Sequence, residues 1–525
     1  MNKLVKYIKA NSRKISILFI SLFFVTFPMI MTYDSAHYMG YVQIFENVLP
    51  FSTWDIVRGP VFPILIHLSN LFFGKTSNGI VLFSFIFYLV MLFVSAKIIK
   101  EFSQENKKIK TVLMILFFLL VVFNIIVFGY YHTLLTEFVA MTVSVVSCYL
   151  SWKLLLKTTK GDKKYYFLLM LYFVVMVPFS WFLKQPYVSI TLFPLIISTI
   201  ISLFTSRPIK KILPHFAVLL LSIGSLFVGI FAWNKVLERK GLETDTSRSA
   251  FNMLGQGMID PLENYEILED VDIGYLEKTQ FLSSDEREML NSAKNNFKVV
   301  EVYNTKETLI DQMLVKTKEN GFISSEDALK FIIKAFFTHP LETLNSYVVN
   351  YLGIVNAYHP RTLNSVEYYI DKDFSLLGCQ ENCGIATIIG QTRSNIFYMP
   401  ENLAYRIQDY EQSINSPFLF RLILNSLKTT SIVAFNVSLF LLPFVLPAII
   451  LYLILAKKRS RNKREIMYLS IILLGYSFLH ICAHSVISAT IDRYASPAYI
   501  TAILGYFGII SLLLYNTKHE KRYKK

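Results

Sequence analysis

Residues 79–96 read GIVLFSFIFYLVMLFVSA and contain no charged side chain. A helix needs about 20 apolar residues to cross the ~30 Å hydrocarbon core of a bilayer. Residues 212–233, ILPHFAVLLLSIGSLFVGIFAW, have the same character. A soluble core does not need apolar runs of this length, so both stretches predict membrane-spanning helices.

The composition extends this interpretation to the whole chain of 525 residues. Hydrophobic residues make up 54% of it, charged residues 17%, and the mean hydropathy is +0.45. These values exclude a soluble enzyme, a disordered scaffold and a disulfide-stapled secreted domain. We expect an all-α polytopic membrane protein with about ten transmembrane helices, near residues 15–31, 79–96, 111–129, 133–152, 165–183, 187–204, 212–233, 429–455, 466–488 and 495–515.

The distribution of basic residues orients the predicted spans. Of the 52 Lys and Arg residues, 29 lie in segments 1–14, 97–110, 153–164, 207–211, 457–464 and 518–525. Short basic loops stay on the cytoplasmic side. We therefore predict a multi-pass protein of the cell membrane with both termini cytoplasmic. The net charge of +15 is then an orientation signal and not a nucleic-acid footprint.

Three parts follow from this pattern: a membrane core with spans one to seven (1–235), an extracytoplasmic insert (236–428) and a second membrane core with spans eight to ten (429–525). Residues 234–428 hold 19 Lys and Arg against 27 Asp and Glu, unlike the basic loops. The insert is predicted to be mostly helical, because Ser283 and Ser324 each begin a helix-capping pattern.

Cysteine and histidine give weak signals. Cys379 and Cys383 lie in the predicted outer insert, where a disulfide is allowed but not required. His480 and His484 are four residues apart, on one face of the predicted ninth span, as a metal pair would be. Without a further ligand, a polar pair lining an outer cavity is favoured. No cofactor is predicted with certainty, and a divalent metal remains open.

Several polar residues near membrane level fall on the outer side if these spans are correct. They are His37, Tyr38, Asp34, Asp55 and Arg58 in the first outer loop, Glu137 at the head of span four, Lys184 between spans five and six, and Asp492, Arg493 and Tyr494 before span ten. Considered singly, each has an ordinary structural role: Lys184 is typical of a membrane anchor, Glu137 of the first turn of a helix, and Asp34 of a helix cap. Together, carboxylates and cations at one face are better explained as a site.

The charges suggest a class of reaction. A carboxylate can take a proton from an incoming hydroxyl group, and cations can bind a phosphate and stabilise it as a leaving group. No nucleotide pool exists outside the cell, so the phosphate would arrive on a lipid. Aromatic residues nearby, such as Trp54 and Tyr187, suit sugar stacking or an interfacial belt.

Five short motifs occur in order along the chain. They are Asp34, RGPVFPILIHLSNLFFG from Arg58, LLTE ending at Glu137, KQP from Lys184 and RYASP from Arg493. In this order they resemble the GT-C superfamily of integral-membrane glycosyltransferases, relatives of the protein mannosyltransferases and the aminoarabinose lipid A transferases. The resemblance covers about residues 1–235 and 429–515 and leaves the insert unmatched.

The resemblance implies roles for these residues. Asp34 would be the catalytic carboxylate and Glu137 the second acid, while Arg58, Lys184 and Arg493 would bind the phosphate of a polyprenyl-phosphate sugar. Residues 60–73 would form an amphipathic helix at the membrane surface. The first loop has a single Asp where the mannosyltransferases have an Asp-Glu pair, and Lys184 stands where relatives more often have Arg. Acceptor class (glycan, lipid or protein) and metal dependence therefore stay open.

Two other classes of membrane protein compete with a transferase. A glycan polymerase or ligase would use a similar donor, but its key residues are expected in a large late outer loop. A transporter of lipid-linked glycans would be expected to have interrupted helices near the bilayer midplane. The sequence shows no matching pair of interrupted spans, so we expect a glycosyltransferase.

Overall fold

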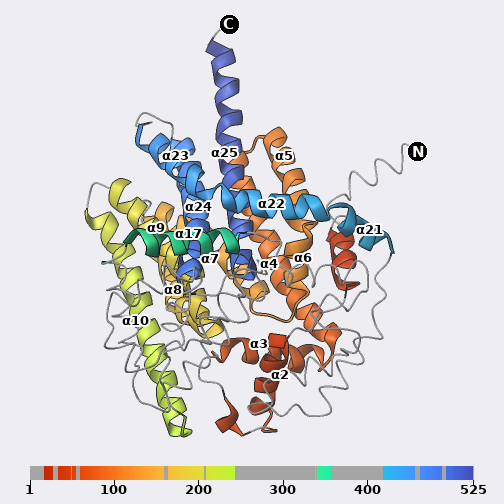
Figure 1. Ribbon diagram of the computed structural model, residues 1–525. Coiled ribbons are helices and arrows are strands. Elements are labelled where there is room, and N and C mark those ends of the chain that lie inside the picture. Colours follow the sequence, from red (N-terminus) through yellow and green to blue (C-terminus); the bar gives the residue numbers. More distant parts are fainter. Residues whose placement is uncertain are drawn as a thin grey trace.

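The computed structural model describes residues 17–27, 33–48, 50–54, 59–158, 163–205, 209–242, 337, 340–355, 418–455, 461–487 and 492–523, some of them by their backbone alone. All regular elements among these residues are helical and none is a strand (Figure 1). Seven of the helices are long and apolar enough to cross a membrane, or nine if each of two bent helix pairs is one span. The predicted all-helical class is therefore confirmed for the described residues, and the seven candidate spans are consistent with a membrane protein. The count of ten spans stays a prediction.

The helices follow one another along the chain as follows: α2 (Tyr33–Phe45), η1 (Phe51–Thr53), α3 (Val61–Phe73), α4 (Ser77–Ser103), α5 (Lys107–Phe117), η2 (Phe118–Val122), α6 (Ile125–Tyr131), α7 (Glu137–Thr158), α8 (Lys163–Leu183), η3 (Gln185–Val188), α9 (Ser189–Thr205), α10 (Ile209–Arg239), α17 (Pro340–Ile354), α21 (Phe418–Ser426), α22 (Lys428–Phe440), α23 (Leu442–Leu455), α24 (Arg461–Ile487), η5 (Asp492–Ala495) and α25 (Ser496–Tyr523). Residues 17–25 are also helical; the remainder of the predicted first span lies mostly outside the described residues.

The central helices are α7, α9, α24 and α25. In α7, α24 and α25, 72% of the apolar window is buried inside the protein, against 11% in α10, which lies at one flank (Figure 1). Small residues let α24 and α25 approach closely, as is common between membrane helices. A Cβ atom at Gly508 of α25 would overlap Ser470 of α24.

Two of the predicted spans are bent rather than straight. The pair α5–α6 turns by 59° and the pair α22–α23 by 52°, where the apolar runs at 111–129 and 429–455 each predict one span. At the first bend, Asn124 caps α6 by accepting hydrogen bonds from the backbone N–H groups of Ile126 and Val127. At the second, Leu441 separates α22 from α23, and Pro443 lies in the first turn of α23, where proline favours a helix start.

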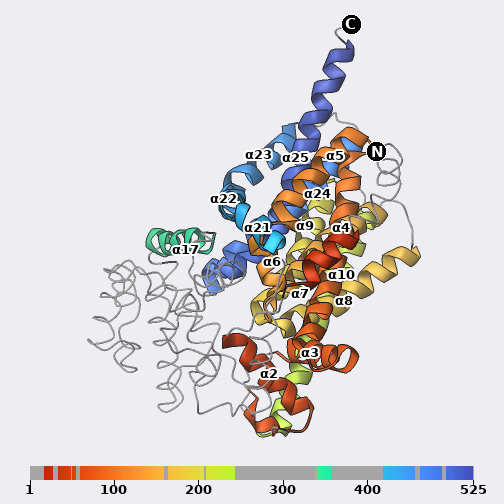
Figure 2. The same ribbon diagram turned by 90° about the vertical axis from the view of Figure 1, so that its right-hand side faces the viewer.

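The helices α2 and α3 lie at one end of the bundle (Figures 1 and 2). The predicted helix at 60–73 is confirmed as α3, which ends at Gly74 with a left-handed φ of 80°. Within the predicted insert, α17 and α21 are described. The expected helices at Ser283 and Ser324, and the pair Cys379 and Cys383, lie outside the described residues.

Candidate functional site

Glu137 begins α7, as the sequence predicts, and its side chain is only 1% exposed. Its two carboxylate oxygens accept hydrogen bonds from different hydroxyl groups. Tyr187 donates to Oε1 over 3.1 Å, and Thr136 donates to Oε2 over 3.3 Å. Buried charges are costly unless they are paired and hydrogen-bonded, so these contacts hold the carboxylate in one orientation.

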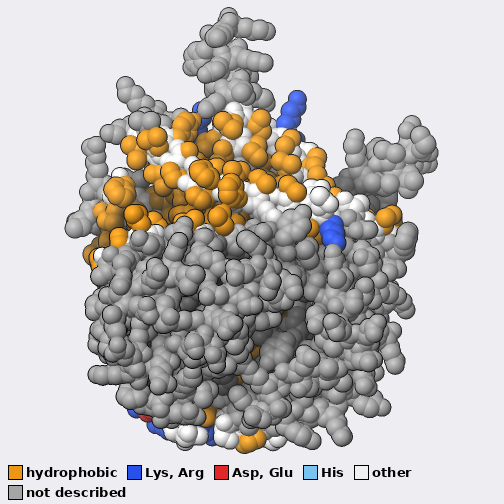
Figure 3. Space-filling model, in the orientation of Figure 1, with side chains coloured by type: hydrophobic (Ala, Val, Ile, Leu, Met, Phe, Trp, Pro, Cys, Tyr) orange, Lys and Arg blue, Asp and Glu red, His pale blue; other side chains and the backbone are white. Residues whose placement is uncertain are grey.

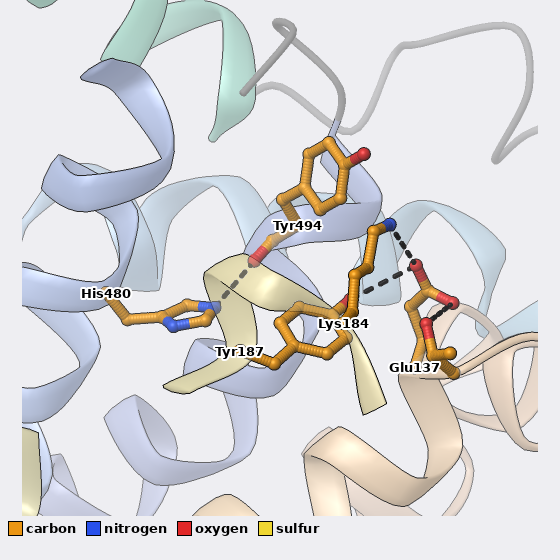
Figure 4. Close-up of polar contacts among 6 residues, drawn as sticks. Glu137, Lys184, Tyr187, His480 and Tyr494 are labelled. Atoms are coloured by element: carbon orange, nitrogen blue, oxygen red, sulfur yellow. Dashed lines mark hydrogen bonds and ion pairs between the residues drawn. The ribbon is translucent and has the colours of Figure 1, made fainter. Parts of the chain in front are cut away.

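Lys184 occupies the turn between α8 and η3 and reaches toward this carboxylate (Figure 4). Its Nζ lies 3.9 Å from Oε1 of Glu137, at the outer limit of an ion pair, and its side chain is 15% exposed. The same Nζ lies 4.2 Å from the centroid of the Tyr494 ring, a distance suited to a cation–π contact. Two predicted site residues are thus brought together, an acid from the start of α7 and a cation from the turn between α8 and η3.

The two histidines of α24 contact residues next to Glu137 and Lys184 in this site. His480 contacts the hydroxyl group of Ser189 through Nδ1 (2.7 Å) and the backbone carbonyl oxygen of Tyr494 through Nε2 (3.0 Å). His484 stacks on the Tyr494 ring, with centroids 4.8 Å apart and planes 11° from parallel. Both histidines are fully buried, and their contacts with Tyr494 join α24 to η5. The cavity that they are predicted to line stays a prediction.

These contacts also bear on metal binding. Both ring nitrogens of His480 already have partners within the protein, so this histidine would have to give one up to bind a metal. In the part of the chain that the structure describes, no group of three or more His, Cys, Asp or Glu side chains is placed to hold a metal ion.

The helix that carries Asp34 is fixed to the segment before Glu137. Ser35 of α2 donates a hydrogen bond to the carbonyl oxygen of Leu134 over 2.8 Å. One turn further, Tyr38 is buried with its ring 4.8 Å from that of Phe62 in α3. The backbone of the predicted catalytic Asp34 therefore lies near the LLTE motif. The side chains of Asp34 and His37 are outside the described residues.

A close backbone contact joins the RGP motif to the turn with Lys184. A Cβ atom at Gly59 would overlap the carbonyl oxygen of Phe182, two residues before Lys184, so only glycine fits there. Asp55 and Arg58 lie outside the described residues, but Gly59 is the direct neighbour of Arg58. For Asp492 and Arg493 the structure describes the backbone, in η5, and not the side chains.

An aromatic cluster lies under the first loop. The Trp54 ring is 4.6 Å from that of Tyr41 and 5.6 Å from that of Trp233, and its side chain is 3% exposed. Trp54 therefore packs the first loop against the end of α10, a structural role, and is not an open platform for a sugar.

His132 lies five residues before Glu137, in the connection between α6 and α7. Its ring nitrogens are each 2.9 Å from a backbone carbonyl oxygen, those of Phe128 and Phe24. Burial disfavours the charged imidazolium and lowers the pKa of His132 from 6.5 to about 4, although the two hydrogen bonds act in the opposite direction.

Three contacts around the site were not predicted from the sequence: those of Ser189 with His480, of Gly59 with Phe182, and of the Tyr187 hydroxyl group with Glu137. Gly59 and Tyr187 lie within or next to the quoted motifs, whereas nothing in the pattern points to Ser189. The chain matches no protein-family model, no curated protein and no solved structure. The geometry of the site is therefore the basis on which its function is inferred.

Proposed function

We propose that this protein is a membrane glycosyltransferase of the GT-C type, which moves a sugar from a polyprenyl-phosphate carrier to an acceptor. The observation that carries the proposal is the convergence of five sequence motifs that are far apart in the chain. Lys184 links two of them: its Nζ lies 3.9 Å from Glu137 Oε1 and 4.2 Å from the centroid of the Tyr494 ring. The two first-loop motifs lie near these residues in the backbone: Ser35 bonds to Leu134, three residues before Glu137, and Gly59 lies against Phe182, two residues before Lys184.

The chemistry assigned to this site is a group transfer. A hydroxyl oxygen of the acceptor attacks the anomeric carbon of the sugar and loses its proton to a carboxylate, for which Asp34 is the first candidate. The bond between the anomeric carbon and the phosphate oxygen breaks, and polyprenyl phosphate leaves with the electron pair. Lys184, Arg58 and Arg493 would stabilise the growing charge on this phosphate. Glu137 would be the second acid of the site, and it would orient Lys184 in the absence of the donor.

The proposal places the site on the outer face, in a chain of ten spans with cytoplasmic termini. In its support, Lys97 and Lys100 in α4 and Lys463 and Arg464 in α24 are near the ends of these helices opposite the site. A cysteine introduced at Val48, an exposed residue of the predicted first outer loop, should react with an impermeant thiol reagent from outside, and cysteines in 457–464 should not. The reverse pattern would contradict this orientation.

A transporter of lipid-linked glycans is the alternative that one observation favours. The sequence predicts no pair of interrupted spans, yet two bent helix pairs are present, and transporters use such breaks to bind substrates. The break at Asn124, however, is satisfied within the protein. The Asn124 amide group donates to the carbonyl oxygen of Ser431 and the hydroxyl group of Tyr499, and the Ile125 N–H donates to Ser431. These groups are therefore engaged and not directed at a ligand.

The test compares cells and purified protein. Surface glycans and lipid-linked sugars should be measured by mass spectrometry with and without the protein, to identify the donor that accumulates in its absence. The purified protein in nanodiscs should then transfer sugar from that donor. Asp34→Asn should lower this activity by at least about 10²-fold, the usual contribution of acid–base catalysis.

A matched control is Glu101→Gln, since Glu101 also pairs with a lysine but at the far end of the bundle. Full transfer by Asp34→Asn would remove the carboxylate assignment. Movement of intact donor across the membrane, without cleavage of the sugar–phosphate bond, would instead support a transporter.

A further inference from the structure

Helix α17 has two different faces. One face packs on the membrane helices: Tyr351, Ile354 and Val355 are buried, and the Tyr351 hydroxyl group donates to the carbonyl oxygen of Leu439 over 2.9 Å. The Tyr351 ring lies 6.2 Å from that of Phe478 in α24. These contacts fix α17 to both α24 and the end of α22.

A neighbouring face, about a quarter-turn around the helix, is apolar and exposed. Leu341, Leu344, Val348 and Leu352 are 76%, 52%, 48% and 44% exposed. Their spacing of three, four and four residues places them in one stripe along the helix. A contiguous stripe of this kind is disfavoured in water, because each side chain would leave its apolar area hydrated. Something apolar is therefore expected to cover it.

The surroundings of α17 indicate what covers the stripe. In Figure 1, α17 runs across α24, whose long axis follows the bundle. The neighbouring helices α22 and α23 expose Val437, Phe440 and Phe444. Figure 3 shows hydrophobic side chains gathered over the half of this face that contains α22 and α23, down to the level of α17. The stripe is thus continuous with a surface that lipid chains cover if these helices span the membrane.

From these observations we infer that α17 is an interfacial helix, with its exposed stripe embedded in the acyl chains of the membrane leaflet nearest to Glu137 and Lys184. A helix with an apolar face lying in the membrane plane is a known binding mode. Because α17 also packs against η5, this anchorage would hold the segment with Tyr494 at the membrane boundary. The inference does not depend on the reaction that the site performs.

The test is fluorescence quenching in the full-length chain. The four native cysteines are replaced, and single cysteines are introduced at Leu344 or Val348 and labelled with an environment-sensitive dye. The protein is then placed in nanodiscs of phosphatidylcholine with or without doxyl-labelled lipid. Phe444→Cys in α23 is the positive control. Lys235→Cys, near the end of α10 with a half-exposed side chain, is the aqueous control.

We expect doxyl lipid to quench dyes at 344 and 348 as strongly as the dye at 444, and iodide in the buffer to quench them less than the dye at 235. Strong iodide quenching without lipid quenching would overturn the inference, because the stripe would then face water. Protection from both quenchers would also overturn it and would indicate cover by protein; disulfide crosslinking of Val348→Cys between chains would then identify a second copy as the partner.

Discussion

Two glutamate–lysine pairs lie near opposite ends of α7 and differ in their surroundings. Glu101 and Lys153 are 2.8 Å apart, and Glu101 is 39% exposed; Glu137 and Lys184 are 3.9 Å apart, and Glu137 is 1% exposed. Lys153 and Glu137 are 16 residues apart in the helix, or about 24 Å at 1.5 Å per residue. In both pairs the lysine also lies over an aromatic ring, that of Trp152 or Tyr494.

The difference in burial suggests that the Glu101–Lys153 pair is a surface contact and that the Glu137–Lys184 pair belongs to a binding site. In the short pair the glutamate is 39% exposed, and ion pairs in contact with solvent contribute little to stability. The buried glutamate instead receives hydrogen bonds from Tyr187 and Thr136 and holds its lysine loosely. A cation held at 3.9 Å from its partner remains able to move to a phosphate. The two pairs should therefore respond very differently to the same substitutions.

The largest effect is expected at the buried carboxylate. Glu137→Gln keeps the shape of the side chain but removes its charge, so sugar transfer should fall by at least about 10²-fold. Glu101→Gln should leave transfer near the unmodified level. Initial rates in nanodiscs, with thermal stability as the control for folding, give both values. Equal activities of the two variants would erase the distinction between the pairs.

The next effect concerns the contact that brings the first loop to Lys184. Gly59→Ala places a Cβ atom where the carbonyl oxygen of Phe182 lies, so the loop and the turn must separate. Misplacement of a reacting group by about 1 Å can cost about 10²-fold in rate. Transfer should therefore fall to a similar degree.

The matched control for this substitution is Gly224→Ala in α10, where a Cβ atom meets nothing within 4 Å. This variant should keep its activity. A fully active Gly59→Ala variant would show that the close contact is not needed for the site.

A smaller effect is expected for the two lysines. Lys184→Ala should weaken binding of the donor by about 10-fold, or about 1.4 kcal/mol, the order of a charged hydrogen bond. Lys184→Arg should bind better than Lys184→Ala because the charge is kept. Lys153→Ala should not change donor affinity. Titration of the lipid-linked donor in nanodiscs measures these values, and unchanged affinity in Lys184→Ala would remove this lysine from the phosphate site.

The sequence predicted the elements around these pairs better than their contacts. The start of α7 at Glu137 and the turn at Lys184 follow from the lengths of the apolar runs and the polar residues between them. The bends at Asn124 and Leu441 were not predicted, because an apolar run shows its length and not its direction. An asparagine within VVFNII and a proline after Leu442 were the available signals.

Long-range contacts were the least predictable part of the site. Ser189 and His480 are 291 residues apart in sequence and form a 2.7 Å contact, and no periodic pattern relates such positions. The histidine pair could be found from its spacing of four residues, but its burial could not. In this structure both histidines contact Tyr494, and their place in an outer cavity stays a prediction.

Acidification is expected to lower the stability of the folded protein by about 1 kcal/mol through His132, which precedes Glu137 in the chain. The pKa of His132 is about 4 in the folded protein, against 6.5 for an unperturbed histidine, so the unfolded chain binds a proton first as the pH falls. His132 therefore does not lower the free energy of unfolding above pH 6.5. Below this pH the unfolded chain gains a proton that the folded protein does not, so the free energy of unfolding falls as the pH approaches 4. Linkage gives a loss of about 1 kcal/mol between about pH 7 and about pH 5.5. Thermal unfolding in detergent should show this loss, and His132→Gln should reduce it; an equal loss in both proteins would contradict the assignment.

The smallest effect should come from the exposed pair itself. Glu101 and Lys153 are expected to contribute only about 0–1 kcal/mol to stability, and less at high salt, since exposed ion pairs are screened. A double-mutant cycle with Glu101→Gln and Lys153→Met, measured by thermal unfolding at low and high salt, isolates this coupling. The same cycle applied to Glu137→Gln and Lys184→Met should show a coupling that salt changes less, because the buried carboxylate is shielded from ions. If both couplings fall equally with salt, the two ends of α7 do not differ electrostatically.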